Sequence, residues 1–226
     1  MSPSRPARPL GIPALVRRLE KVYGPRVWRR RRTSGLDQLV ATVLSQNTND
    51  ANSSEAFRRL RKALPTWEAV RAAPVGRIER AIRVGGLART KARRIKRILD
   101  IIHERYGRLS LEFLAGAPLQ QARAALADLP GVGPKTVGCV LMFGFGRPVL
   151  PVDTHVHRVS TRLGLIPAGT SAERAHELLQ ARAPDRLVYA FHVLLIEHGR
   201  RTCRARKPAC AGCVLADRCP SAGRAG

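Results

Sequence analysis

Apolar side chains recur at three- and four-residue intervals along most of this sequence. Leu36, Leu39, Val40, Val43 and Leu44 would share one face of a helix, because these intervals place side chains above one another on successive turns. Apolar sets with the same spacing predict further helices near residues 57–64, 78–82, 95–102 and 119–129. Residues 136–145 are apolar on nearly every side, which predicts a buried central helix.

Residues that commonly cap or end helices stand at the boundaries of these segments. Proline or glycine follows three of the predicted helices, at Pro65, at Gly85 with Gly86, and at Gly107. Three more helices are predicted towards the C-terminus. Asp153 would cap the first, which runs to residue 163. Thr170 and Glu173 would form a capping box for the second, which ends near residue 183. Asp185 would cap the last long helix, and Gly199 would end it.

No stretch of the sequence alternates apolar and polar residues in the manner of a strand. We therefore predict an all-α fold. The chain has 226 residues, of which 44% are hydrophobic and only 4% aromatic. A chain of this length buries a sizeable core without disulfides, and the low aromatic content predicts a core of aliphatic side chains.

Basic residues greatly outnumber acidic ones. Forty-one Lys and Arg face 16 Asp and Glu, which gives a formal net charge of +25. Such a charge repels itself unless a polyanion is the normal partner, so nucleic acid is the favoured partner and an anionic membrane surface the alternative. Residues 1–9 read as a flexible basic arm, with a mitochondrial transit peptide as the less favoured interpretation.

No apolar run approaches the roughly 20 residues of a membrane helix. The apolar stretch at residues 9–16 is too short for a secretory signal and is followed at once by two arginines. We therefore expect no membrane partner and a cytoplasmic protein, associated with a bacterial nucleoid.

A glycine-rich turn at residues 129–136 separates two predicted helices. Gly131 and Gly133 flank Val132 and permit a very tight hairpin, while Pro134 suits the first turn of the next helix. Backbone N–H groups of such a hairpin, with the start of the helix and Thr136, can bind a DNA phosphate. Val132 would anchor the hairpin in the core.

Lys135 is one of only six lysines and lies in the first helical turn after this hairpin. The helix dipole there disfavours an ammonium, so the sequence predicts a nucleophilic amine that can form a Schiff base, with a phosphate contact as the alternative. Eighteen residues later, Asp153 could cap a helix and also face the lysine. His155 is interpreted as a packing residue or a phosphate ligand.

Four of the five cysteines lie near the C-terminus as Cys203, Cys210, Cys213 and Cys219, spaced C-x6-C-x2-C-x5-C. Zinc sites usually show two C-x2-C pairs or histidine ligands, whereas this compact spacing suits an iron–sulfur cluster; both remain open from spacing alone. The loop between the first two cysteines carries Arg204, Arg206 and Lys207, which could meet a phosphate backbone. Cys139 reads as a buried apolar residue.

Four motifs in this order resemble the endonuclease III branch of the helix–hairpin–helix DNA glycosylases. They are L-S-Q-N-T-N-D at residues 44–50, L-P-G-V-G-P-K-T at 129–136, V-D-T-H at 152–155 and H-G-R-R-T-C with the cysteine loop from 198. The resemblance covers most of the chain. It implies a [4Fe–4S] cluster on the four cysteines. We therefore expect an iron–sulfur cluster rather than zinc at this site.

The resemblance also implies an architecture and a reaction. Residues 30–148 would form a six-helix domain with the hairpin, and residues 149–226, joined by a helix within 1–29, a cluster domain; double-stranded DNA would bind a monomer in the cleft between them. Lys135 would attack C1′ of an oxidised pyrimidine nucleotide that has been flipped out, Asp153 would be the essential carboxylate, and the strand would be cut by β-elimination.

In the family, side chains on two loops fill the gap that the flipped base leaves. The matching positions here are Asn47, beside Gln46, and Leu87. The family more often has glutamine where this chain has Asn47.

Three alternatives differ in chemistry. An adenine-specific mismatch glycosylase would need a catalytic glutamate where this sequence has Thr42, and would lack the lysine. A thymine-mismatch glycosylase tends to replace the lysine as well. A non-catalytic DNA-binding protein, or a redox sensor, would need neither Lys135 nor Asp153. No set of aromatic residues suggests an RNA-stacking platform.

Overall fold

The computed structural model describes residues 10–29 and 33–223 of the chain. The proposed basic arm at residues 1–9 lies outside this part. Within the described residues all regular structure is helical and no strand occurs, so the predicted all-α fold is confirmed. Two compact units are formed, one by residues 10–29 with 148–223 and the other by residues 33–147.

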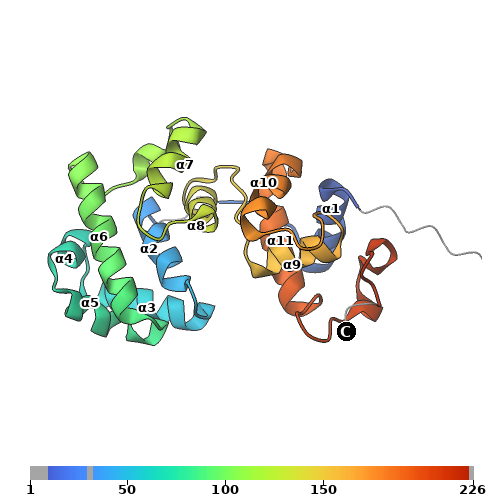
Figure 1. Ribbon diagram of the computed structural model, residues 1–226, viewed down its shortest axis with the longest axis horizontal. Helices are drawn as coiled ribbons and strands as arrows, with labels where there is room; N and C mark the ends of the chain where they lie inside the picture. The colour runs from blue at the N-terminus through green and yellow to red at the C-terminus, as the bar shows by residue number, and fades with distance from the viewer. Residues whose placement is uncertain (1–9, 30–32, 224–226) are drawn as a thin grey trace, which may run out of the picture. The chain divides into compact units, whose positions relative to one another are not determined.

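The unit formed by residues 33–147 is a bundle around α2 (Figure 1). The helix α2 packs against α3, α6 and α8, while α5 packs against α3 and α6. Its elements are α2 (Gly35–Ser45), α3 (Asp50–Ala63), α4 (Trp67–Ala72), α5 (Val75–Ile82), η1 (Arg83–Gly85), α6 (Ala88–Tyr106), η2 (Glu112–Ala115), α7 (Leu119–Ala127), α8 (Pro134–Cys139) and η3 (Val140–Gly144).

Close packing around α2 explains the residues at its start. Ser34 caps the helix and forms a reciprocal capping box with Asp37, which satisfies donors that the helix cannot pair internally. Gly35 lies against the ring of Phe145, and a Cβ atom added there would meet the ring Cζ at 2.2 Å. A larger residue at this position would force the Phe145 ring, which follows η3, to move.

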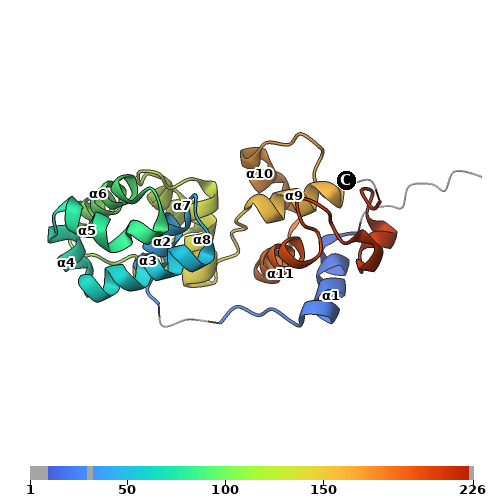
Figure 2. The ribbon, with the colours of Figure 1, turned by 90° about the horizontal axis from the view of Figure 1, so that it is seen from below.

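The second unit is built on α11 (Val188–Arg201), which packs against both α9 (Thr154–Arg162) and α1 (Ile12–Tyr23) (Figure 2). Its remaining elements are α10 (Ala172–Arg182), η4 (Asp185–Leu187), η5 (Cys210–Gly212) and η6 (Ala216–Arg218). Phe191, Leu194 and Leu195 of α11 are fully buried together with Leu15 and Leu19 of α1. The helix at the start of the chain therefore shares its core with the cysteine-rich end.

Several predicted helix boundaries are confirmed. Asp153 caps α9 by accepting a hydrogen bond from the Val156 N–H at 2.8 Å. Gly107 ends α6 in the left-handed conformation, and the predicted buried helix at 136–145 is α8 continued by η3, a π-helix. The short α4 escaped prediction because its six residues are too few to show a period.

Three predicted boundaries are wrong. Ser171, not Thr170, caps α10 by accepting from the Arg174 N–H, because the Thr170 hydroxyl donates to the Pro167 carbonyl instead. Asp185 does not cap α11 but lies in the preceding 3-10 turn η4.

Gly199 does not end α11, which continues to Arg201. A Cβ atom added to Gly199 would lie 3.0 Å from His155 Nδ1 and 3.1 Å from His155 Cβ. The glycine is therefore present for the close approach of α9 to α11 rather than to terminate a helix.

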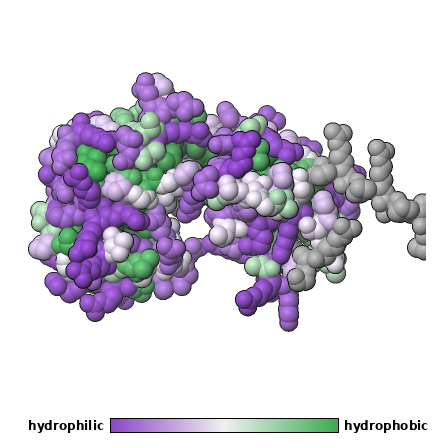
Figure 3. Space-filling model, in the orientation of Figure 1, coloured by the Kyte–Doolittle hydropathy of each residue, from purple (hydrophilic) through white to green (hydrophobic). Residues whose placement is uncertain are grey.

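The visible face of each unit is dominated by hydrophilic residues, and its apolar residues form small separate groups (Figure 3). Within the described part of the chain, no helix combines the length and the apolar character needed to cross a bilayer. The apolar residues are used mainly in the two cores.

Candidate functional site

The glycine-rich turn forms a hairpin between α7 and α8. Val132 is only 5% exposed, and its N–H donates to the Leu129 carbonyl at 3.1 Å, so it anchors the turn as predicted. Gly131 takes a left-handed φ of 72°, but Gly133 has a φ of −91°. Only Gly131 therefore requires glycine for its backbone conformation.

Two side chains brace this hairpin from outside. The Gln46 amide donates to the Gly131 carbonyl at 3.1 Å and accepts from Arg94 Nη1 at 2.6 Å. Arg94 also lies against Gly131, where an added Cβ atom would come within 2.3 Å of its Nε. The Gln46 Nε2 atom is 3.4 Å from the Thr136 hydroxyl, so one amide connects the end of α2 to both sides of the hairpin.

Lys135 lies in the first turn of α8, directly after Pro134. Its side chain is partly exposed, whereas Thr136 beside it is buried. The lysine is therefore carried on a helix that continues without a break into the buried η3. A rigid support of this kind holds a side chain in a defined position.

Asp153 is held by a separate set of contacts in the other unit. Its Oδ1 accepts the cap hydrogen bond from Val156. The preceding backbone is fixed from two sides: the Val152 N–H donates to His176 Nε2 at 3.0 Å, and His192 Nδ1 lies 2.9 Å from the Pro151 carbonyl oxygen. The side chain of Asp153 is partly exposed, so a carboxylate is presented on an ordered backbone.

His155 lies on α9 facing α11. Its Nδ1 is 3.1 Å from Arg158 Nη2, and Gly199 packs against the ring. Burial lowers the pKa of this imidazole, because a charged ring is poorly solvated there. The structure thus places His155 as a packing residue, one of the two roles that the sequence predicted.

The two predicted gap-filling residues share an unusual backbone. Asn47 has a φ of 52° and Leu87 a φ of 48°, and Lys207 is the one other non-glycine residue with a positive φ among those the structure describes. Leu87 is 58% exposed, which is costly for a large apolar side chain. Left-handed backbone at non-glycine residues is uncommon and concentrates at functional sites.

All four C-terminal cysteines line one pocket. Among the described residues, no three His, Cys, Asp or Glu side chains lie close enough together to hold a single metal ion. Four thiols that line one pocket are a donor set that an iron–sulfur cluster accepts. They would hold the cluster, which when bound supplies folding free energy by joining four points of the segment.

The loop between Cys203 and Cys210 is fixed by two arginines of α9. Arg158 donates to the Cys203 carbonyl through Nε and Nη2, and Arg162 donates to the carbonyls of Arg204 and Ala205 at 2.7 and 3.0 Å. The side chains of the predicted DNA contacts in this loop remain exposed: Arg204, Arg206 and Lys207.

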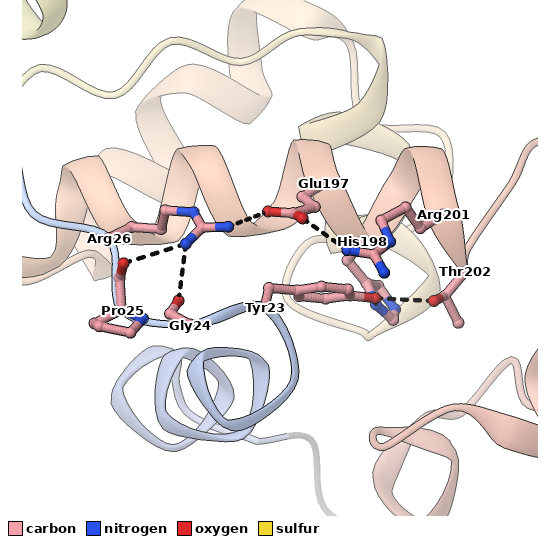
Figure 4. Close-up of polar contacts among 8 residues, drawn as sticks. All are labelled: Tyr23, Gly24, Pro25, Arg26, Glu197, His198, Arg201 and Thr202. Atoms are coloured by element: carbon pink, nitrogen blue, oxygen red, sulfur yellow. Dashed lines mark hydrogen bonds and ion pairs between the residues drawn. The ribbon is translucent and has the colours of Figure 1, made fainter.

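A partly buried network that the sequence did not predict joins Tyr23 at the end of α1 to His198 and Thr202 at the end of α11 (Figure 4). His198 is 2% exposed; its Nδ1 is 3.0 Å from the Tyr23 hydroxyl and its Nε2 is 3.7 Å from Cys213 Sγ. The Tyr23 hydroxyl is also 2.9 Å from Thr202 Oγ1. Burial lowers the pKa of His198 to about 4, so the ring is neutral at physiological pH.

Comparison with known proteins identifies this combination of hairpin and cysteine loop. Residues 40–185 match the model of the HhH-GPD superfamily of base excision DNA repair proteins, and residues 203–219 match the iron–sulfur binding domain of endonuclease III. The chain belongs to the endonuclease III family. The four cysteines lie within the segment that matches the iron–sulfur binding domain, and the predicted [4Fe–4S] cofactor is confirmed.

Relatives of this endonuclease III family member cover most of its length. Endonuclease III of Sulfolobus acidocaldarius is 35% identical over 80% of the chain and 79% of its own length. A putative DNA glycosylase of Arabidopsis thaliana is 41% identical over 77% of the chain, which spans only 59% of that relative. A trapped covalent endonuclease III–DNA intermediate superposes with a TM-score of 0.79 at 30% identity, covering 93% of this chain and 96% of that one. These similarities make the protein a DNA glycosylase of the base excision repair class.

Proposed function

We propose that this protein is a bifunctional DNA glycosylase and abasic-site lyase that removes oxidised pyrimidines. The observation that carries the proposal is Lys135, a partly exposed amine in the first turn of the helix that follows the hairpin. The solved relative trapped as a covalent DNA intermediate supports a reaction that passes through a bond between protein and DNA.

The reaction proposed for Lys135 proceeds in two stages. The neutral amine forms a bond to C1′ as the bond from C1′ to the base breaks, and the base leaves with that electron pair. After the amine has lost its proton and the sugar ring has opened, an imine joins Nζ to C1′. Removal of a proton from C2′ then breaks the C3′–O bond and releases the downstream strand with a 5′-phosphate.

Asp153 is assigned the role of an electrostatic partner in the first stage. A carboxylate near the sugar stabilises the positive charge that develops there as the base leaves. The cap hydrogen bond occupies Oδ1, and within the described residues no hydrogen bond to Oδ2 occurs. We assign Oδ2 to the sugar or to the attacking amine.

Damaged double-stranded DNA is the proposed partner of a monomeric enzyme. The net charge of +25 matches a phosphate backbone. Because the Val132 N–H donates within the hairpin, we assign phosphate contacts to the backbone N–H groups of Gly131 and Gly133, and to the exposed cations of the cysteine loop. Asn47 and Leu87 are assigned to the gap that the flipped base leaves, because enzymes that act on a base must first extrude it.

The structure gives the adenine-specific alternative no support. Thr42, at the position where that branch needs a carboxylate, is 4% exposed and donates its hydroxyl to the Gln38 carbonyl at 2.7 Å. A solved thermostable thymine-DNA glycosylase shares the fold at 22% identity. This likeness extends to the fold alone.

Borohydride trapping tests the proposal. Duplexes that carry one thymine glycol or one abasic site are incubated with the protein and reductant, and covalent adducts are counted on a denaturing gel. Wild type should be trapped on both, whereas Lys135→Gln should still bind but form no adduct. Lys62→Gln, which removes an exposed lysine of α3, is the matched control. An adduct in Lys135→Gln equal to that of wild type would refute the assignment.

A further inference from the structure

A buried lysine that has no place in the proposed chemistry connects the two loops of the gap-filling residues. Lys91 lies in the first turn of α6 and is only 2% exposed. Its ammonium donates one hydrogen bond to the Leu44 carbonyl and another to the Gly85 carbonyl, each at 2.8 Å. Both acceptors belong to other elements of the same unit.

Each acceptor carbonyl stands shortly before a gap-filling residue. Leu44 lies in the last turn of α2, three residues before Asn47, and Gly85 ends η1 two residues before Leu87. Both residues then take the left-handed backbone described above. Lys91 itself lies four residues after Leu87. The backbone N–H of Lys91 donates to the Leu87 carbonyl at 2.9 Å. One side chain therefore ties together the backbone that leads into both loops.

Lys91 is an expensive choice for a purely structural role. Lysine is almost never fully buried without a partner, and within the described residues no carboxylate lies within ion-pair distance of its Nζ. Burial lowers the pKa of Lys91, and the nearby Arg94 lowers it further. An apolar side chain of similar length would avoid the desolvation of the ammonium but would leave the Leu44 and Gly85 carbonyls without this donor.

We propose that Lys91 is a positioning residue that holds Asn47 and Leu87 as one rigid wedge for entry into duplex DNA. The inference rests on the proposed function, in which these two side chains occupy the gap left by the flipped base. The hydrogen bonds of Lys91 fix the spacing of the two loops before DNA binds, so that DNA binding need not order the loops. A wedge matters only where a base must be unstacked from a duplex.

The same helix supplies a matched control. Lys96 of α6 likewise donates to two backbone carbonyls, those of Arg71 and Ala73 at the end of α4. It thus joins two elements by the same chemistry, but neither acceptor adjoins a gap-filling residue. Replacing either lysine should lower the stability of the fold, whereas only replacement of Lys91 should impair the wedge.

The experiment compares Lys91→Met, Lys96→Met and wild type on duplex and single-stranded DNA. Borohydride trapping on a single-stranded abasic oligonucleotide reports the amine, and excision of thymine glycol from a duplex reports the whole reaction. Fluorescence of 2-aminopurine opposite a stable abasic analogue reports insertion without catalysis. For Lys91→Met we expect duplex excision to fall on the order of 10- to 100-fold, with reduced 2-aminopurine fluorescence and single-stranded trapping within about twofold of wild type.

A double-mutant cycle with Leu87→Ala completes the test. If Lys91 acts through the wedge, the loss in Lys91→Met should shrink when Leu87 is already absent. The inference would be overturned if Lys91→Met and Lys96→Met lost duplex excision equally. It would also be overturned if the losses of duplex excision in Lys91→Met and Leu87→Ala were fully additive. If Lys91→Met does not fold, Lys91→Arg keeps the cation but displaces its donors, and should show the same duplex-selective loss. Failure of wild type to be trapped on any substrate would instead overturn the proposed function.

Discussion

The hydroxyl of Tyr23 lies 3.0 Å from Nδ1 of His198, and this contact joins the first helix of the chain to the ring behind the cysteine loop. The opposite ring nitrogen, Nε2, is 3.7 Å from Cys213 Sγ. With Cys213 bound to the cluster as a thiolate, its sulfur can only accept, so the ring proton lies on Nε2 and Nδ1 accepts from the Tyr23 hydroxyl. The tyrosine thereby directs an N–H group at a sulfur that we assign to the cluster.

Replacing Tyr23 should change the reduction potential of the cluster while leaving the fold intact. In Tyr23→Phe the ring proton is no longer confined to Nε2, so the hydrogen bond to Cys213 weakens. Hydrogen bonds to ligand sulfur raise the reduction potential of iron–sulfur clusters, so we expect a lower potential, measured by protein-film voltammetry. The lost hydroxyl contacts should also reduce the free energy of unfolding by about 1 kcal/mol.

Tyr106→Phe provides the control for this measurement. Tyr106 packs on Phe113 in the other unit, with ring centroids 4.5 Å apart. Its replacement should leave the potential unchanged. A potential in Tyr23→Phe equal to that of wild type would contradict the role assigned to the hydroxyl.

The two hairpin glycines should respond differently to alanine. Gly131→Ala introduces a Cβ atom at a φ of 72° and within 2.3 Å of Arg94 Nε. The left-handed backbone alone costs an alanine about 1–2 kcal/mol, and Arg94 must move away from Gln46. We expect a lower free energy of unfolding by denaturant titration, together with weaker DNA binding.

Gly133→Ala should separate stability from binding. Gly133 has a φ of −91°, and an added Cβ atom meets nothing within 4 Å. The free energy of unfolding should therefore remain within about 0.5 kcal/mol of wild type, while affinity for duplex DNA falls because a methyl group stands where the backbone would approach a phosphate. Unchanged affinity in Gly133→Ala would contradict the assigned phosphate contact.

Helices with a full apolar face were predictable because burial imposes their spacing. Leu39 and Val43 of α2, like Ile98 and Ile102 of α6, are all fully buried. The caps at Thr170 and Asp185 were wrong because several residues near a helix start can serve, and only tertiary contacts choose among them. Local sequence does not contain that choice.

The site was predictable where a motif is contiguous and not where contacts are distant. The hairpin and the cysteines could be read directly, but the bracing of the cysteine loop by Arg158 and Arg162 joins residues more than 40 positions apart. Two missed residues did leave a signal. Lys91 and His198 occupy apolar register positions, four residues before Ile95 and three after Leu195, where a polar residue requires a special partner.

Binding to duplex DNA should depend strongly on salt. Each neutralised phosphate releases counterions, so the logarithm of affinity falls linearly with the logarithm of salt concentration. Arg204, Arg206 and Lys207 are exposed on the braced loop, and removing one phosphate contact should reduce the slope by about 1. Arg206→Gln is therefore expected to weaken binding about equally for damaged and undamaged duplexes, measured by fluorescence anisotropy between low and high salt.

Arg174→Gln, at an exposed residue of α10 paired with Glu177, is the control that should leave the slope unchanged. A flat salt dependence in wild type would refute the electrostatic basis of DNA binding, and an Arg206→Gln slope equal to that of wild type would remove the loop from the interface.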